Sequence, residues 1–494
     1  MKQPALSRRL SGVLLHPTSL PGPRGGSLGA RALEFVEFLA DAGQSWWQVL
    51  PLCPTDGGGS PYNSPSAFAG NPALIDADLL AAEGLLKKSE LGQPRERALR
   101  AAFAHFSKRA AREDRADLEA FVARESVWLS DHALFLALKD AQGGRPWTQW
   151  DEPLRRREPA ALAAARARLG AEVAFHEFSQ WLFSRQWEAV RRHAAARGVG
   201  LIGDAPIYVS HDSADCWSRQ ELFRLDEAGR PDGCAGVPPD YFSADGQLWG
   251  NPLYRWEAHE ATGFAWWTAR LRLAAARFDA LRLDHFIGFR NYWEVPAGAK
   301  TAAGGRWVTA PGDALFETIR REVPHLGLIA EDLGALTPPV AALRDKFGLP
   351  GMKIGQFSFG EEKDGPAHWP ENSAAYTGTH DNDTARAWFE DDGSSGRTPE
   401  QLARERAAFL SAAGGAIADG PAWAMTRVVW RSPSRLAVAP MQDLLGLGGE
   451  ARMNHPGTVD GNWRWRMEPD ALTARLAGRL GVLTGATGRA PEAT

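Results

Sequence analysis

Three acidic residues stand where short apolar runs of this chain end. Asp284 and Glu331 each follow such a run directly, and Asp381 comes shortly after a third. Apolar runs of this length with turn residues behind them are typical of buried strands. If the strands are parallel, their carboxyl ends meet at one edge, and the three side chains lie together. A carboxylate nucleophile and a carboxylic acid about 5 Å apart cleave a glycosidic bond with retention of configuration.

Asp284 shares a strand face with an arginine. Arg282 and Asp284 are two residues apart, and alternate side chains of a strand point to the same side. A guanidinium beside a carboxylate orients it, lowers its pKa and keeps it ionised. We therefore expect Asp284 to have the environment that a nucleophile requires.

Glu331 directly follows the apolar run 326–330, with no other polar residue between the run and the carboxyl group. A carboxyl against an apolar wall has a raised pKa and can hold a proton near neutrality, which suits a general acid. Asp332 is the rival at the next position. It faces the other side of the strand, where an acidic residue can also serve as a helix cap or a loop ligand. Spacing alone leaves both residues possible.

The third acidic region contains two candidates after the turn at Gly378. Asp381 or Asp383 could hold sugar hydroxyls as positive charge develops on the ring. The pair His380-Asp381 could instead bind a metal ion. Further histidines near strand ends keep that alternative open: they are His16, His211 and His285. Because the sequence has no HxH or HExxH cluster, carbohydrate chemistry without a metal is favoured.

Eight strand-length runs alternate with helix-like stretches along the chain. This order predicts a parallel sheet, and eight strands predict a closed (β/α)8 barrel. An open doubly wound sheet is less favoured because no GxGxxG turn follows the first run. The expected strands are 12–15, 47–52, 200–203, 278–283, 326–330, 352–357, 374–377 and 435–439.

We expect one catalytic barrel over 1–494, interrupted twice. Residues 75–175 are rich in Ala, Leu, Arg and Glu and predict a helical insertion, with helices at 95–108, 118–139 and 159–169. Residues 205–260 contain a long loop in which aromatic residues alternate with polar ones. Such a loop is either an ordinary surface loop or a lid over a carbohydrate groove.

Composition excludes several classes of partner. The chain has 494 residues and a formal net charge of −4, which gives no reason to expect nucleic acid or an anionic membrane. No apolar run approaches the length of a bilayer span, and the N-terminal run 13–15 is too short for a signal-peptide core. The three cysteines are widely spaced and odd in number, which fits a reducing cytoplasm. The sequence does not disclose an oligomeric state.

The acidic strand ends and the polar, aromatic loops described above resemble segments of the 4-α-glucanotransferases, the amylomaltase or disproportionating-enzyme family. The resemblance extends over almost the whole chain. The Arg282-x-Asp284 and His380-Asp381 strand ends are shared with the wider α-amylase clan. The strings 238–242 and 249–252 point to the amylomaltases in particular. The matching segments are 60–62, 203–209, 236–254, 282–286, 330–334 and 377–384.

The resemblance implies a (β/α)8 barrel with helical insertions, no C-terminal β-sandwich and no cofactor. It also implies retaining transfer of α-1,4-glucan segments to a glucan or glucose acceptor. Asp284 would be the nucleophile, Glu331 the acid/base and Asp381 the transition-state stabiliser. The substrate-binding residues implied are Ser60, Tyr62, Asp204, Asp240, Phe242, Gln247, Trp249, Arg282, His285, His380 and Asn454.

Other functions use the same residues. An α-glucan hydrolase would have the same carboxylates, and a glucan-binding protein could have an inactive barrel. The intact carboxylates argue against an inactive barrel. A metal-dependent barrel hydrolase is the remaining alternative, which activity after exhaustive chelation would exclude.

Overall fold

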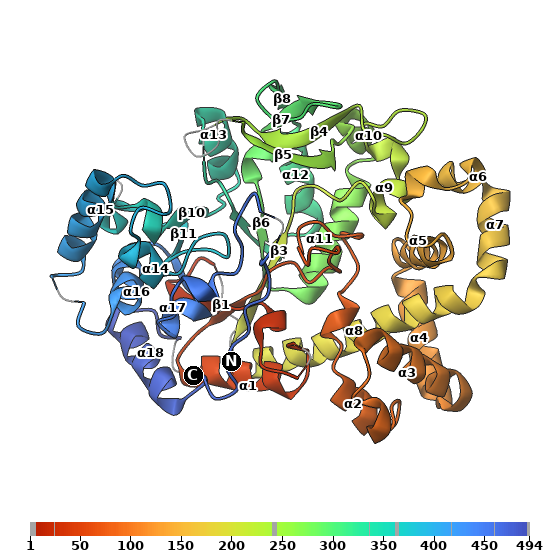
Figure 1. The fold of residues 1–494 in the computed structure, drawn as a ribbon, viewed down its shortest axis with the longest axis horizontal. Coiled ribbons are helices and arrows are strands. Elements are labelled where there is room, and N and C mark those ends of the chain that lie inside the picture. The colour runs from red at the N-terminus through yellow and green to blue at the C-terminus, as the bar shows by residue number, and fades with distance from the viewer. Residues whose placement is uncertain are drawn as a thin grey trace.

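A closed barrel of eight parallel strands forms the centre of the computed structural model (Figure 1). The strand order around the barrel is β1-β12-β11-β10-β9-β6-β3-β2. Each of the eight predicted runs overlaps one of these strands, so the predicted (β/α)8 barrel is confirmed. The strands are β1 (Leu10–Leu14), β2 (Trp46–Gln48), β3 (Gly200–Ala205), β6 (Ala280–Leu283), β9 (Gly327–Ala330), β10 (Gly351–Ile354), β11 (Ser373–Tyr376) and β12 (Leu436–Pro440). The structure describes residues 6–23, 25–239, 245–334, 336–360, 365–415, 417–458 and 460–491.

Two apolar layers hold the barrel together. Alternate strand residues fill its interior, including Trp46, Ile202, Ile329 and Tyr376. The residues between them point outward and pack against the surrounding helices in a much larger cluster. This period of two determines which strand-end residues enter the mouth of the barrel.

Helices surround the barrel, and both described ends of the chain lie near each other on one side of it (Figure 1). Further helices lie between β3 and β6 and after β12. The helices outside the insertion are α1 (Ala30–Asp41), α8 (Gly170–Ala196), α9 (Ala214–Ser218), α10 (Trp256–Ala261), α11 (Ala265–Arg277), α12 (Gly312–Glu322), α13 (Pro338–Lys346), α14 (Ala385–Glu390), α15 (Pro399–Ala412), α16 (Pro421–Arg431), α17 (Met441–Leu444) and α18 (Ala474–Ala486). No helix of the described ranges is long and apolar enough to cross a membrane.

Between β2 and β3 the chain forms a group of helices beside the barrel (Figure 1). The expected helix 118–139 is two helices, because the chain turns after Glu125. The Trp128 indole donates a hydrogen bond to Glu125 at 2.9 Å, and Trp128 is buried at this turn. The helices are α2 (Ala77–Ala82), α3 (Arg95–Arg109), α4 (Arg112–Arg124), α5 (Leu129–Ala141), α6 (Glu152–Arg155) and α7 (Pro159–Arg168).

A separate antiparallel sheet stands over the barrel mouth, and residues 205–260, predicted to contain a long loop, supply only part of it (Figure 1). Its strand order is β5-β4-β7-β8. Half of it comes from the segment after β3, with β4 at Gly233–Val237 and β5 at Gln247–Pro252. The other half follows β6, with β7 at Asn291–Pro296 and β8 at Arg306–Thr309. Pairing between β4 and β7 joins residues far apart in sequence, and a local pattern does not reveal such pairing.

Candidate active site

A groove of about 840 Å³ lies between the barrel mouth and the antiparallel sheet. Asp240 and Phe242 lie outside the described residues. Of the other predicted site residues, Asp204 alone does not line the groove. Those that line it are Ser60, Tyr62, Gln247, Trp249, Arg282, Asp284, His285, Glu331, His380, Asp381 and Asn454.

Arg282 lies between two carboxylates at the floor of the groove. Asp204 of β3 is its register partner, and Arg282 Nη1 lies 2.8 Å from Asp204 Oδ2. Arg282 Nη2 lies 2.8 Å from Asp284 Oδ1. Burial raises the pKa of Asp204, although the charge of Arg282 opposes the shift. The Asp284 side chain is 26% exposed, so the guanidinium orients it while leaving it open to the groove.

Strand parity places Glu331 beside Asp284. In the register of β6 and β9, Arg282 pairs with Ile329. Asp284 and Glu331 each lie two residues further along, so both leave their strands at the same level on the inner face. The same counting points Asp332 outward. Two of the acidic strand ends therefore meet at the barrel mouth.

The Glu331 carboxylate accepts two backbone hydrogen bonds. The His285 N–H donates to Oε2 at 2.8 Å, and the Leu333 N–H donates to Oε1 at 3.0 Å. Burial raises the pKa of Glu331 to about 7, against the opposing charge of Arg282 and with the support of Asp284. A carboxyl with this pKa can donate and recover a proton near neutrality.

Asp332 belongs to the barrel wall. Its Oδ1 accepts a hydrogen bond from the Met352 N–H at 2.8 Å, and its Oδ2 forms an ion pair with Arg344 of α13. The side chain is almost completely buried and does not line the groove. Asp332 therefore ties β9 to β10 and to a helix, and cannot reach a substrate in the groove.

Hydrogen bonds within a turn direct Asp381 into the groove. Asn382 Oδ1 accepts from the Thr379 N–H at 2.8 Å and closes the turn. Asp381 Oδ1 accepts from Asn454 Nδ2 at 2.6 Å and lies 3.4 Å from His380 Nε2. Arg452 donates to the Asp381 carbonyl at 2.7 Å and joins the two loops. The arrangement leaves a carboxylate held between an amide and an imidazole at the groove wall.

Asp383 lies in a smaller pocket behind this wall. It lines that pocket together with His16 and does not line the main groove. Asp383 Oδ1 accepts from the Thr384 N–H at 2.8 Å, and Oδ2 lies 3.6 Å from Arg452 Nη1. Asp383 therefore stabilises the turn that precedes the N-terminus of α14, and it does not contact a substrate in the main groove.

Tyr62 completes the floor. Its hydroxyl donates to Asp204 Oδ2 at 2.7 Å, and its ring stacks on His380 with the centroids 5.0 Å apart. Trp463 lies against the same two rings. The Ser60 hydroxyl accepts from the Tyr62 N–H at 3.3 Å and shapes the turn that presents Tyr62. The flat rings form a surface suited to a sugar ring, and the buried Asp204 holds Tyr62 in that surface.

The antiparallel sheet forms the opposite wall. Trp249 of β5 lies edge-on against His285, with the ring centroids 4.8 Å apart, and donates to Gln247 Oε1 at 3.1 Å. Trp307 of β8 also lines the groove, and it is 45% exposed. Trp307 is not among the residues predicted from sequence, although the preceding Gly304 and Gly305 indicate a turn before an aromatic residue.

Among the described residues, the histidines considered as metal ligands belong to no group of three or more potential ligands. In the described part of the chain, three potential ligands come together only at Asp140, Glu172 and His176, on the helical insertion. There Arg100 already forms an ion pair with Glu172 at 2.9 Å. This group is a surface ion-pair cluster remote from the groove.

Comparison with known proteins shows the family of this chain. The profile of the 4-alpha-glucanotransferase family matches residues 15–473. The chain belongs to this family. It is 49% identical to the 4-alpha-glucanotransferase of Thermus thermophilus, over 97% of this chain and 99% of that protein. It is 45% identical to the 4-alpha-glucanotransferase of Synechocystis sp., over 98% of this chain and 99% of that protein.

A solved family structure matches the whole fold. The amylomaltase of Streptococcus agalactiae, solved in complex with acarbose, superimposes with a TM-score of 0.92. It is 39% identical and covers 98% of this chain and 100% of its own. The chain is thus an enzyme of the glycosyltransferase type that acts on α-glucans, as the family resemblance implied.

Proposed function

We propose that the enzyme transfers α-1,4-glucan segments by a retaining double displacement in the groove. The main support for this proposal is that Asp284 and Glu331 lie on adjacent strands at the barrel mouth. One carboxylate is oriented by a buried guanidinium, and the other is a carboxyl with a pKa of about 7, at the same level of the barrel mouth. This pairing supports a nucleophile and an acid/base on adjacent strands.

In the first step, Asp284 attacks C1 of the donor sugar. The bond from C1 to the glycosidic oxygen breaks, and Glu331 gives its proton to that oxygen, which leaves with the reducing-end segment. In the second step, Glu331 takes a proton from the acceptor 4-hydroxyl, whose oxygen attacks C1 and releases Asp284. Asp381 holds ring hydroxyls while positive charge develops on the sugar.

The substrate-binding roles follow from place in the groove. Arg282, Tyr62 and His380 support the donor sugar at the cleavage point, and Asn454 orients Asp381. Asp204 supports the same sugar from behind, through its contacts with Tyr62 and Arg282. Further along the groove, sugar rings contact the exposed aromatic wall. The residues proposed there are Ser60, Gln247, Trp249 and His285, together with Asp240 and Phe242 outside the described part.

The antiparallel sheet acts as a lid in this proposal. Covering the glycosyl-enzyme would exclude water and favour a sugar hydroxyl as acceptor. The partners are a maltooligosaccharide donor and a glucan or glucose acceptor. We place the enzyme in the cytoplasm, since Cys53, Cys216 and Cys234 are all free thiols.

Incubation with maltotriose tests the proposal. Transfer gives glucose and a ladder of longer maltodextrins, whereas an α-glucan hydrolase of the same clan gives only glucose and maltose. Absence of the longer products at every substrate concentration would refute the transferase assignment. An active enzyme after exhaustive chelation would exclude the metal-dependent alternative.

A further inference from the structure

His285 has a backbone conformation that its residue type rarely adopts. Its φ is 49° and its ψ is 53°, in the left-handed region. Non-glycine residues seldom occupy this region, although asparagine, aspartate and histidine do so more often than others. The residue stands directly after Asp284, so the unusual turn lies beside the reacting groups.

The unusual turn aims two consecutive amides at one residue. The His285 N–H donates to the side chain of Glu331 at 2.8 Å, and the Phe286 N–H donates to the carbonyl of Glu331 at the same distance. With an extended backbone at His285, the N–H groups of His285 and Phe286 would point in different directions and could not both reach Glu331. The left-handed conformation of His285 therefore keeps both amides on Glu331 and helps to hold its carboxyl in place.

Packing holds the imidazole of His285. The Trp249 indole meets it edge-on, with the ring planes at 80°. Gly288 also lies close to the ring, since a Cβ added there would stand 3.0 Å from His285 Cδ2 and 2.8 Å from Ile207 Cδ1. Nε2 is buried and makes no hydrogen bond with a described residue. Since burial lowers the pKa of His285 to about 4, the ring is neutral at pH 7 and is fixed by contact rather than charge.

We propose that His285 is a positioning residue for Glu331, and that the Trp249 indole of the antiparallel sheet holds it in place. The sheet that covers the groove is thereby linked to the acid/base group on the floor. This inference rests on the proposed role of Glu331. It adds a function for His285 and Trp249 beyond contact with sugar.

The proposal predicts a specific change in the pH profile. The His285 N–H stabilises the charged form of Glu331, so losing it raises the pKa of this carboxyl. Because the acid must be protonated, the alkaline limb of kcat/KM moves to higher pH, by about one pH unit. The other charged and titratable groups around Glu331 are unchanged in these variants. They are Tyr62, Arg282, Asp284, His380 and Asp381 in the groove, and the buried Asp204 beneath Arg282.

A matched pair of substitutions separates the backbone from the ring. His285→Val removes the ring and disfavours the left-handed backbone, whereas His285→Asn removes the ring and tolerates that backbone. We expect maltotriose transfer by the valine variant to show the full shift of the alkaline limb, and transfer by the asparagine variant to show a smaller one. Equal positions of the limb in the two variants and the wild type, with only KM raised, would overturn the proposal.

Trp249 gives a second, independent test, because it is 37% exposed and its replacement should not impair folding. Trp249→Ala should move the limb in the same direction as His285→Val, and Trp249→Phe should move it less. In a His285→Val background, Trp249→Ala should add no further shift, since coupled residues are non-additive. Additive shifts would overturn the link between the two residues.

Two controls separate this inference from the proposed function. Trp307→Ala changes another exposed groove tryptophan and should raise KM while the alkaline limb stays in place. Glu331→Gln should abolish transfer. If Glu331→Gln keeps the wild-type rate, the proposed function fails. If it abolishes transfer while His285→Val and Trp249→Ala leave the limb unmoved, this inference alone fails.

Discussion

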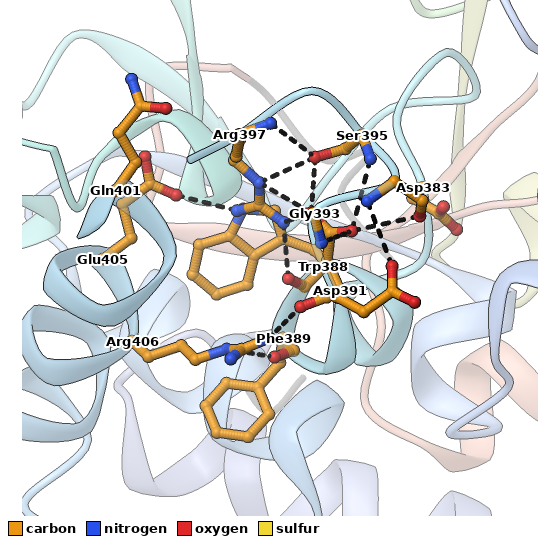
Figure 2. A network of polar contacts seen from close by, with 12 residues as sticks. Asp383, Trp388, Phe389, Asp391, Gly393, Ser395, Arg397, Gln401, Glu405 and Arg406 are labelled. Carbon is orange, nitrogen blue, oxygen red and sulfur yellow. Dashed lines mark hydrogen bonds and ion pairs between the residues drawn. The ribbon is translucent and has the colours of Figure 1, made fainter. Parts of the chain in front are cut away.

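Two arginine–carboxylate networks in this enzyme differ in how fully the protein covers and hydrogen-bonds their carboxylates. At the groove floor, Arg282 pairs with Asp204 and Asp284, and Asp284 keeps part of its surface open. Between α14 and α15, Arg397 pairs with Asp391 and Glu405 at 2.9 and 2.8 Å (Figure 2). Both arginines are mostly buried, so burial alone does not distinguish them.

The Asp391 carboxylate is saturated with donors. It accepts from the Gly393 N–H at 3.1 Å, from the Ser395 hydroxyl and from the Arg397 guanidinium (Figure 2). Burial would raise the pKa of Asp391, but the hydrogen bonds from Ser395, Gly393 and Arg397 outweigh it and lower the pKa to about 2. At the groove floor the balance is reversed, because the pKa of Glu331 is raised. In a structural network the carboxylates have all their hydrogen bonds made by the protein, whereas in a reactive network a carboxyl group is left free to react with a substrate.

The largest expected effect comes from matched Asp-to-Asn substitutions in the two networks. Asp284→Asn should reduce maltotriose transfer by at least about a thousand-fold, since an amide cannot form the glycosyl-enzyme. Asp391→Asn should leave kcat/KM of the folded protein within about two-fold. Initial rates and thermal unfolding of both variants provide the measurement. Wild-type transfer by Asp284→Asn would show that another residue is the nucleophile.

Replacing the arginines contrasts stability with activity. Arg282→Met leaves Asp204 and Asp284 without a counter-charge, which should lower the free energy of unfolding by about 3–5 kcal/mol and transfer by about a hundred-fold. Arg397→Met should also lower stability, by about 1–3 kcal/mol, with unchanged kcat/KM at 25 °C. Denaturant unfolding and rate assays on the same samples would separate the loss of stability from the loss of activity in the two variants. Loss of activity in folded Arg397→Met would contradict the distinction.

The raised pKa of Glu331 predicts the pH dependence. The acid form is required for the first step, so kcat/KM should fall as pH rises through about 7, approaching a tenfold loss per pH unit above that value. Asp391 has its pKa near 2 and so remains charged over this whole range. Measuring kcat/KM from pH 5 to 9, with thermal unfolding in parallel, separates a titrating acid from loss of structure. A flat profile above pH 7 would contradict the assignment.

Strand parity made part of the site predictable from sequence. It placed Arg282 and Asp284 on one face and turned Asp332 away from Glu331, as the structure has them. The choice between Asp381 and Asp383 depends on a turn closed by Asn382, which a period of two does not describe. Trp307 lies on the hairpin strand β8, which reaches the groove because its partner β7 pairs with β4 from a distant segment. Gly304 and Gly305 indicate the turn, but that long-range pairing has no local signal.

Arg452 shares features with both the structural network around Arg397 and the reactive groups of the groove. Like Arg397 it donates to backbone carbonyls, but its acceptors are Asp381 at 2.7 Å and Asn454 at 2.9 Å, beside the reactive groups. Arg452→Gln should therefore displace Asp381 and lower kcat by about ten-fold with little change in KM or unfolding temperature. The exposed Arg386, paired with Glu390 on α14, provides the control substitution Arg386→Gln.

Steady-state kinetics on maltotriose separate the two possible outcomes for Arg452. If Arg452 positions Asp381, kcat falls while KM holds, because Asp381 acts on the charge that develops in the transition state. If Arg452 only ties its own loop to the turn that precedes α14, as Arg397 ties α14 to α15, stability falls and kcat of the folded enzyme is unchanged. The second outcome would place Arg452 with the structural network and leave Asn454 and His380 as the side chains that hold Asp381.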